Sequence, residues 1–245
     1  MEEKETLYGK NPAELTALCA ESGLPRFAAR QIARWLYVRH TEDPLRMTDL
    51  PTAARERLAE QFAPALHAPE RVSVSADGTK KYLYRTLRGH FIESAYIPDG
   101  DRATLCVSSQ AGCRMGCRFC ASTIAGFVRH LLPSEMLLQV YETERDSGRH
   151  VDSIVLMGIG EPLDNYDNVM RFLTLMNSEG DGMSLRHISL STCGVVPRIY
   201  DLAELKTGLT LSISLHSATD ERRSEIMPIN RKYHLDELMK ACRHY

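Results

Sequence analysis

The chain contains the segment Thr104-Leu-Cys-Val-Ser-Ser-Gln-Ala-Gly-Cys113-Arg-Met-Gly-Cys117-Arg-Phe-Cys120, which joins an expected strand directly to three closely spaced cysteines. Residues Thr104 to Ser109 are typical of a strand, and the loop after them carries cysteines in the spacing C-x3-C-x2-C. Thiolates are soft ligands that suit iron–sulfur chemistry. Three of them on one short loop can hold three irons of a [4Fe-4S] cluster and leave the fourth iron open. The segment therefore predicts an iron–sulfur site.

A zinc site is the alternative for the same cysteines. With Cys106 as a fourth ligand, four thiolates can close a tetrahedral zinc site. Structural zinc sites usually show two separate C-x2-4-C pairs, whereas this run is a single loop with Phe119 immediately before the last cysteine. The spacing therefore favours the open cluster.

Composition excludes several classes of protein. The 245 residues are 43% hydrophobic and 25% charged, which is typical of a soluble globular protein of one or two domains rather than a disordered, collagen-like or coiled-coil chain. No apolar run approaches the roughly 18 residues that span a bilayer. The start Met1-Glu2-Glu3-Lys4-Glu5 does not resemble a signal peptide, so we expect a cytoplasmic protein without a membrane partner. The formal net charge of -2 gives no bulk sign of nucleic-acid binding.

The seven cysteines argue against a disulfide framework, because their number is odd and the chain lacks a secretory signal. Four of them, including Cys106, fall within fifteen residues, which favours metal or thiol chemistry. We expect Cys19 and Cys193, which lie outside that group, to be buried small side chains.

Strand-like and helix-like segments alternate from Thr104 onward. Repeated strand–helix units predict an α/β fold with a parallel sheet, either doubly wound or a barrel. The expected strands are Thr104–Ser109, Ser153–Met157, His187–Ser191 and Leu209–Leu215, and the expected helices are Ser134–Asp146, Tyr166–Met176, Pro197–Leu205 and the segment from His234 onward.

The first seventy residues are expected to be helical, with Asn11 as the N-cap of the first helix and a linker over Ala63–Pro69. A second helix from about Pro25 and a third over about Pro51–Phe62 follow. The second helix carries Arg26, Arg30 and Arg34 on one face. That stripe is either a solvated surface or a phosphate-contacting one. Asp77-Gly78 then predicts a β-hairpin.

Three successive strands end in glycines or small polar residues. Gly160 and Glu161 follow the second strand of the alternating region, Ser191 ends the third and Ser214 follows the fourth. Ligands bind at the carboxyl ends of strands in barrels, so these turns predict a ligand site above the cysteine loop.

Six motifs together resemble the dual-specificity rRNA/tRNA adenine-C2 methyltransferases, the RlmN branch of the radical SAM enzymes. The resemblance covers nearly the whole chain, and the related adenine-C8 rRNA methyltransferases are the nearest alternative. The motifs are Phe91-Ile-Glu-Ser-Ala-Tyr-Ile-Pro98, Asp101-Arg-Ala-Thr-Leu-Cys-Val-Ser-Ser-Gln-Ala-Gly-Cys113, Gly158-Ile-Gly-Glu-Pro162, Leu190-Ser-Thr-Cys-Gly-Val-Val-Pro197, Ile213-Ser-Leu-His216 and Met227-Pro-Ile-Asn-Arg-Lys-Tyr233.

The resemblance implies a set of site residues. Glu93 matches the position assigned as proton acceptor, and Cys106 matches a thiol that resolves a covalent enzyme–RNA intermediate. The cluster ligands would be Cys113, Cys117 and Cys120, and the pocket for S-adenosylmethionine (SAM) would be lined by Gly160, Glu161, Ser191, Ser214, Leu215 and His216.

The resemblance also implies a reaction and its partners. The chain would methylate C2 of an adenine in 23S rRNA, and in tRNA, through a methyl-cysteine intermediate. Its cofactors would be a [4Fe-4S] cluster and SAM, with flavodoxin or ferredoxin as the electron donor. Its fold would be a partial (β/α) barrel with about four of six units at 99–245, a helical N-terminal domain at 1–70 that contacts RNA, and a β-hairpin connector at 71–98.

The family's methyl-carrying cysteine lies near its carboxyl terminus, in a segment without a counterpart in these 245 residues. Cys242 does not match it, because it falls in the helix after Arg231-Lys-Tyr233. The chain therefore resembles a truncated family member, for which we expect no turnover alone. An inactive RNA- or SAM-binding module is the remaining alternative.

Overall fold

The computed structural model of the chain describes residues 5–41, 43–65, 67–178 and 182–245. Residues 1–4, which carry most of the argument against a signal peptide, lie outside these ranges, as does Leu66 of the expected linker. Within the described part of the chain, no helix is long and apolar enough to cross a membrane.

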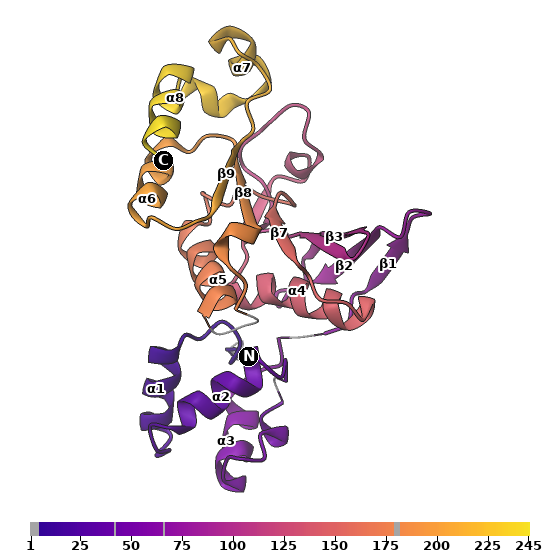
Figure 1. Ribbon diagram of the computed structural model, residues 1–245, viewed down its shortest axis with the longest axis vertical. Helices are drawn as coiled ribbons and strands as arrows, with labels where there is room; N and C mark the ends of the chain where they lie inside the picture. Colours follow the sequence, from indigo (N-terminus) through magenta and orange to yellow (C-terminus); the bar gives the residue numbers. More distant parts are fainter. Residues whose placement is uncertain (1–4, 42, 66, 179–181) are drawn as a thin grey trace.

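Three helices form the N-terminal end of the molecule (Figure 1). Asn11 caps the first helix as expected. Its side chain accepts a hydrogen bond from the Glu14 N–H, and the Glu14 carboxylate accepts one from the Asn11 N–H, both at 2.9 Å. These bonds satisfy N–H groups at the start of the helix. The helices are α1 (Pro12–Glu21), α2 (Ala28–Tyr37) and α3 (Thr52–Gln61), with a 3-10 turn at Pro44–Arg46.

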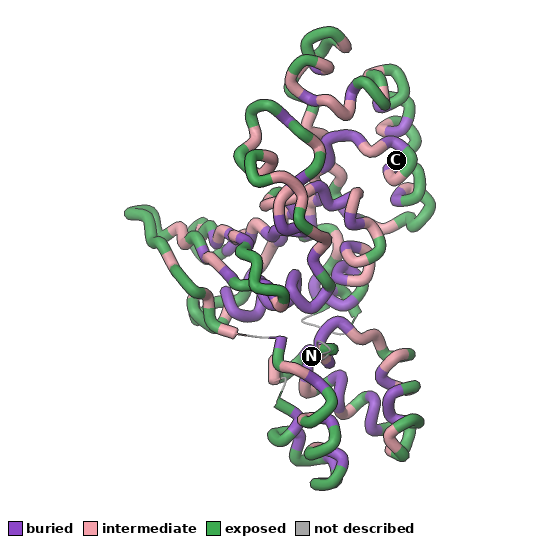
Figure 2. The backbone as a smooth tube through the Cα atoms, turned by 180° about the vertical axis from the view of Figure 1, so that it is seen from behind, coloured by how far each residue is buried: buried purple, intermediate pink, exposed green. Residues whose placement is uncertain are grey.

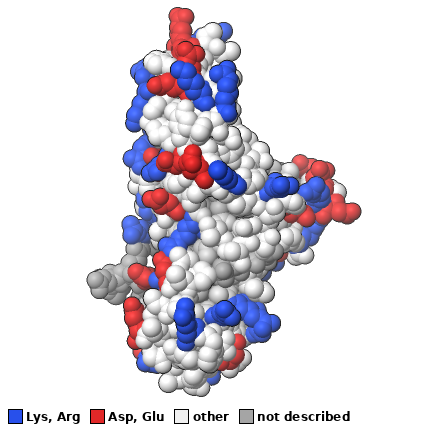
Figure 3. Space-filling view, turned by 60° about the vertical axis from the view of Figure 1, so that its left-hand side comes forward, with Lys and Arg blue, Asp and Glu red and all other residues white. Residues whose placement is uncertain are grey.

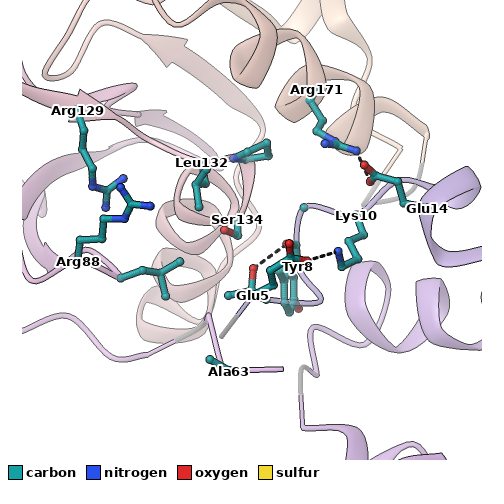
Figure 4. A pocket seen from close by; sticks show the side chains of 14 residues that line it. Glu5, Tyr8, Lys10, Glu14, Ala63, Arg88, Arg129, Leu132, Ser134 and Arg171 are labelled. Carbon is teal, nitrogen blue, oxygen red and sulfur yellow. Dashed lines mark hydrogen bonds and ion pairs between the residues drawn. The ribbon is translucent and has the colours of Figure 1, made fainter. Parts of the chain in front are cut away.

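A cavity of about 410 Å³ lies where this helical end meets the rest of the chain (Figure 4). Lys10 pairs with Glu5 at 2.8 Å, and Arg171 of the core pairs with Glu14 of α1. Arg129, also in its lining, is held by Glu135 at 2.5 Å. Charges in this junction are therefore largely balanced, and the Arg171–Glu14 pair links the helical end to the core.

A seven-stranded mixed sheet forms the core, in the order β1-β2-β3-β4-β7-β8-β9. The pairs β1–β2, β2–β3 and β3–β4 are antiparallel, whereas the pairs β4–β7, β7–β8 and β8–β9 are parallel. The strands are β1 (Arg71–Val74), β2 (Lys80–Arg85), β3 (Phe91–Asp99), β4 (Arg102–Cys106), β7 (Ser153–Leu156), β8 (Ile188–Thr192) and β9 (Thr210–Ile213), while β5 (Gln110–Gly112) and β6 (Phe127–His130) form a separate ribbon.

Helices connect the parallel strands in the expected alternation, and the predicted α/β class is confirmed. The parallel strands follow one another across the sheet without the reversal of order that defines a doubly wound fold, so the barrel type is the one present. The helices are α4 (Pro133–Ser147), α5 (Tyr166–Ser178), α6 (Val196–Glu204), α7 (Asp220–Ile226) and α8 (Leu235–His244), with 3-10 turns at Ala121–Thr123, Leu185–His187 and Pro228–Arg231.

The two faces of the sheet differ in burial. Figure 2 shows buried segments gathered in the middle of the molecule. Leu105, Ile154 and Leu190 are buried in one hydrophobic cluster with residues of α4 and α5. The residues between them, which alternation turns to the other face, are small or polar and only half-buried. They include Thr104, Cys106, Val155, Ser189 and Ser191. This open face lies beside the carboxyl ends of the parallel strands.

Several expectations differ from the structure in detail. The hairpin at Asp77-Gly78 is present, but residues 71–98 extend the main sheet rather than standing apart from it. The domain boundaries stay a prediction. The strand expected over Thr104–Ser109 ends at Cys106, because the Ser108 N–H bonds to the Gln139 side chain instead of a neighbouring strand. The short elements β5, β6 and α7 were not expected.

The turn after β7 packs directly against the segment after β4. A Cβ added to Gly158 would lie 2.7 Å from Ser108 Oγ, and one added to Gly160 would lie 2.6 Å from Gln110 Cβ. Gly160 also has a φ of +109°, in the region that side chains disfavour. Contacts within the chain therefore require glycine at both positions, whether or not a ligand also approaches them.

Replacing Gly160 with alanine should lower the free energy of unfolding by more than about 2 kcal/mol, because overpacking costs about 1–3 kcal/mol and the backbone conformation adds strain. Gly148→Ala is the matched control, since Gly148 has a φ of +66° but nothing within 4 Å of an added Cβ. We expect it to cost only about 1–2 kcal/mol. Urea unfolding of both variants measures the difference, and equal losses would contradict the close contact.

Candidate cluster and cofactor site

The cysteine loop is held at its base by the β5–β6 ribbon. The Cys113 N–H donates to the Gly126 carbonyl at 3.2 Å, and an added Cβ on Gly112 would lie 1.9 Å from that same oxygen. Gly112 has a φ of +73°. The two strands therefore approach so closely that only glycine fits, and this closure sets where the three cysteines begin.

A polar network anchors the ribbon to the turn after β7. The Gln110 side chain donates to Asp164 at 2.8 Å and accepts from the Glu161 N–H at 2.9 Å. Asp164 also accepts from Arg114 at 2.8 Å, and Arg114 lies near His130 at 3.2 Å. The network fixes the cysteine loop relative to the ends of the parallel strands.

The three cysteines and the strand ends line one cavity of about 280 Å³. The cysteine loop forms one wall and the turns after β7, β8 and β9 form the other. Of the expected site residues, Cys113, Cys117, Cys120, Gly160, Glu161, Ser191, Ser214 and His216 line it. The separate sequence signals therefore meet at one place.

Burial disfavours the thiolate form of Cys113 and Cys117 in the free chain. Burial raises the pKa of Cys117 to about 11 and also raises the pKa of Cys113. Thiols bind metals as thiolates, so iron binding here would release protons.

Glu161 is the one buried carboxylate of the cavity lining. Burial raises the pKa of its carboxyl group. Its two oxygens accept backbone hydrogen bonds from Leu163 at 3.0 Å and from Cys193 at 2.8 Å, which joins the turn after β7 to the turn after β8. The side chains of Thr192 and Cys193 also hydrogen-bond to this carboxylate, so it is tied to the turn after β8 at several points.

His216 and the serines complete the strand-end wall. His216 has a φ of +57°, an uncommon conformation for a residue with a side chain, and its ring lies 4.3 Å from that of Phe119 in the cysteine loop. Ser191 and Ser214 share a hydroxyl contact at 3.3 Å. The strained turn therefore closes the cavity against the cysteine loop.

Three expected site residues do not line this cavity. Leu215 is partly exposed, and its carbonyl accepts from Arg223 at 3.2 Å. Glu93 pairs with Lys81 at 2.8 Å, with 42% of its side chain exposed. Cys106 lies on the open face of the sheet, and burial raises the pKa of its thiol.

Cys193 and Arg223 are residues at or near this cavity whose role there was not predicted from the sequence. Cys193 was expected to be an inert buried side chain, and it is buried, but it also lines the cavity beside Cys117. Its position directly after Ser191-Thr192 is the signal that could have placed it there. Arg223 is fully buried behind the same wall, and nothing in its local sequence marks it.

The donor set fits an iron–sulfur cluster better than a single zinc ion. Among the described residues, no three His, Cys, Asp or Glu side chains are gathered as around one metal ion. A cluster spreads its thiolates over several irons, so they need only line a common cavity. Cys106, the fourth ligand that the zinc alternative requires, does not line that cavity.

Two family models match the chain. The radical SAM superfamily matches residues 107–245, and the ribosomal RNA large subunit methyltransferase N-terminal domain matches residues 6–63. The first match contains the cysteine loop and all the turns that line the cavity.

Curated relatives and a solved structure agree with these models. A protein of Lachnospira eligens named "Probable dual-specificity RNA methyltransferase RlmN" is 44% identical over 96% of this chain and 68% of its own length. A protein of the same name from Clostridium acetobutylicum is 43% identical over 98% of this chain and 70% of its own. The crystal structure of a radical SAM methyltransferase from Sphaerobacter thermophilus superposes with a TM-score of 0.91 at 40% identity, covering 98% of this chain and 72% of that one. The chain therefore belongs to the RlmN family of radical SAM methyltransferases, enzymes that use a [4Fe-4S] cluster and SAM.

Proposed function

We propose that this chain is the cluster- and SAM-binding part of an enzyme that methylates C2 of adenine in 23S rRNA and in tRNA. The observation that carries the proposal is the single cavity in which three loop cysteines face three strand-end turns. The relatives' names give RNA as their substrate and dual specificity as their property. The adenine-C8 reaction is the competing regiochemistry.

Each residue of the cavity has a role in this proposal. Cys113, Cys117 and Cys120 hold the cluster, while Glu161 accepts a hydrogen bond from the SAM amino group. Gly160, Ser191, Ser214 and His216 border the rest of SAM, and Leu215 joins Ser214 to His216 without lining the cavity itself. The bound cofactors supply the radical chemistry that an adenine ring carbon requires.

Glu93 and Cys106 act from the open face of the sheet. Ala95 pairs with Cys106 and lies two residues from Glu93 on β3, so the two side chains share a face. In turn, Cys106 pairs with Val155 of β7, and the last residue of that strand, Leu156, lines the cavity. An adenine on this face would lie between the cavity and both side chains, with Glu93 released from Lys81.

RNA contacts are proposed for a groove on the helical end. The groove has a volume of about 910 Å³ and has no acidic residue in its lining. It is lined by Arg26, which precedes α2, and by Arg30 and Arg34 of α2. Phe27 beside them is 64% exposed. Guanidinium groups and an exposed ring are suited to the phosphates and bases of a single strand. Figure 3 shows basic side chains gathered on this end of the molecule.

The proposal also covers what these 245 residues do alone. The family's methyl-carrying cysteine would come from a segment beyond the counterpart of Tyr245, with a flavodoxin or ferredoxin as electron donor. Such a reaction belongs in the cytoplasm, where RNA and reduced carriers are found. The 245-residue polypeptide is then expected to bind both cofactors and cleave SAM without methylating RNA.

The reconstituted polypeptide should contain iron and acid-labile sulfide and should release 5′-deoxyadenosine from SAM when dithionite is added. Cys117→Ala should lose both properties because one iron loses its ligand. Cys242→Ala, a partly buried cysteine outside the cavity, is the matched control and should keep both. Zinc without sulfide in the wild-type polypeptide would refute the cluster.

Regiochemistry is tested with a fusion of this chain to the C-terminal part of the Lachnospira relative that lies beyond the match. Nucleoside mass spectrometry of 23S rRNA and tRNA after incubation should show 2-methyladenosine only with the fusion. A product of 8-methyladenosine would favour the competing enzyme. Methylation by the 245-residue polypeptide itself would show that a carrier lies within it.

Replacing Arg26, Arg30 and Arg34 with alanine should weaken RNA binding and flatten its salt dependence. The slope of log K against log salt should fall by about 2–3, because each phosphate contact contributes about 0.7–0.9. The matched control replaces three exposed basic residues at the other end of the chain, Arg222, Lys240 and Arg243, with alanine. Equal slopes for the two triple variants, measured by fluorescence anisotropy, would exclude the groove.

A further inference from the structure

Arg223 of α7 is a buried arginine that hydrogen-bonds to the turns after β8 and β9. It is 1% exposed. Its guanidinium donates to the carbonyl of Cys193 at 2.6 Å, and to those of Leu215 at 3.2 Å and Ser214 at 3.4 Å. A fourth bond goes to the Asn230 side chain at 2.7 Å. One side chain therefore holds the turn after β8 and the turn after β9 together.

The hydrogen-bond acceptors of Arg223 are neutral. Three are backbone carbonyls, and the fourth is an amide oxygen of Asn230, whose own NH2 group is held by Asp220 at 2.8 Å. Burying a guanidinium without a carboxylate partner is costly, because neutral dipoles offset only part of the lost hydration. Burial lowers the pKa of the guanidinium, and Asp220 of the same helix counters only part of that effect, so an anionic group bound in the cavity would add to the balance.

The cavity is on the other side of the turns that Arg223 holds. Cys193, whose carbonyl it binds, turns its side chain into the cavity lining. An added Cβ on Gly194 would lie 3.5 Å from the guanidinium, so the turn and the arginine are in close contact. The positive charge is thus separated from the cavity by a single layer of backbone.

The helix that carries Arg223 is also joined to the cysteine loop. The Arg118 N–H donates to the Ile226 carbonyl at 2.9 Å, and Met227, directly after α7, lines the cavity. Ile226 packs in a small apolar cluster with Cys117, Cys193 and Met227. Arg223 therefore lies where the cluster-binding wall and the SAM-binding wall meet.

We propose that Arg223 is a positioning residue for both cofactors: its hydrogen bonds hold the strand-end turns in the shape that SAM requires, and its buried charge offsets the negative charge of the thiolate-ligated cluster. This inference rests on the proposed cluster and SAM site and adds a residue that does not touch either cofactor. It also explains why a guanidinium, with its fixed fork of donors, occupies the position.

The two parts of the role make separate predictions. Arg223→Met removes both the hydrogen-bond donors and the positive charge. Arg223→Lys keeps the positive charge but loses the planar set of guanidinium donors. The exposed neighbour Arg222 provides the matched control, Arg222→Met. All three chains retain Cys113, Cys117 and Cys120, so iron and sulfide content should equal that of the wild type.

The measurements are the midpoint potential of the cluster and the concentration of SAM that produces half of the change in the electron paramagnetic resonance spectrum of the reduced cluster. Arg223→Met should lower the midpoint potential, because reduction adds negative charge beside a site that has lost its cation. It should also raise the half-saturating SAM concentration by at least about tenfold, which corresponds roughly to the loss of one hydrogen bond to a charged group. Arg223→Lys should keep a potential near wild type with weakened SAM binding. Arg222→Met should change neither.

A merely structural role would not move the potential of an assembled cluster. Wild-type values of both quantities in Arg223→Met would overturn the proposal. If Arg223→Met does not fold, the Arg223→Lys variant tests the proposal instead. SAM binding as tight as in the wild type would refute the positioning role, whereas weakened SAM binding at an unchanged midpoint potential would support it. A wild-type chain that assembles a cluster but binds no SAM would instead refute the proposed cofactor site.

Discussion

The close packing of residues 108–110 against the turn at 158–161 is the contact on which the rest of this structure depends. Ser108 is bound on all sides: its N–H and carbonyl bond to Gln139, and its hydroxyl donates to the Glu93 carbonyl and accepts from the Ile159 N–H. Because the cysteine loop begins three residues after Gln110, any shift here moves the cluster ligands. Glycine at 158 and 160 is the condition for this contact, since a side chain at either position would separate the two segments.

The elements that the sequence predicted well are those specified by neighbouring residues. Asn11 and Glu14 form their capping box within one turn, and the alternation of strands and helices follows local periodicity. The cysteine triplet is equally local, because its spacing already places three thiols on one loop. These features need no knowledge of the tertiary structure.

The features that sequence reasoning missed depend on contacts between distant segments. The β5–β6 ribbon rests on the approach of Gly112 to Gly126, and neither strand is long enough to show a pattern. Cys193 acquires its place from Glu161, which is 32 residues away. Leu215 was expected among the residues that line the SAM pocket, and the carbonyl of this residue is held by Arg223, which is eight residues away. A motif identifies which residues matter without showing which of their atoms do.

The charge balance of the cavity indicates that it is built for its bound state. In the free chain, burial raises the pKa of Cys113, Cys117 and Glu161, so these groups favour their neutral forms. In the proposed site a cluster would reverse this, because its iron would hold the cysteines as thiolates and would bring negative charge to buried groups. The buried guanidinium of Arg223 has no carboxylate among its hydrogen-bond acceptors, and Asp220 offsets part of its cost in the free chain, so the negative charge of a bound cluster would offset more of it. The same residue thus makes the empty cavity less favourable and the loaded one more favourable, which couples the stability of the strand-end turns to cofactor binding.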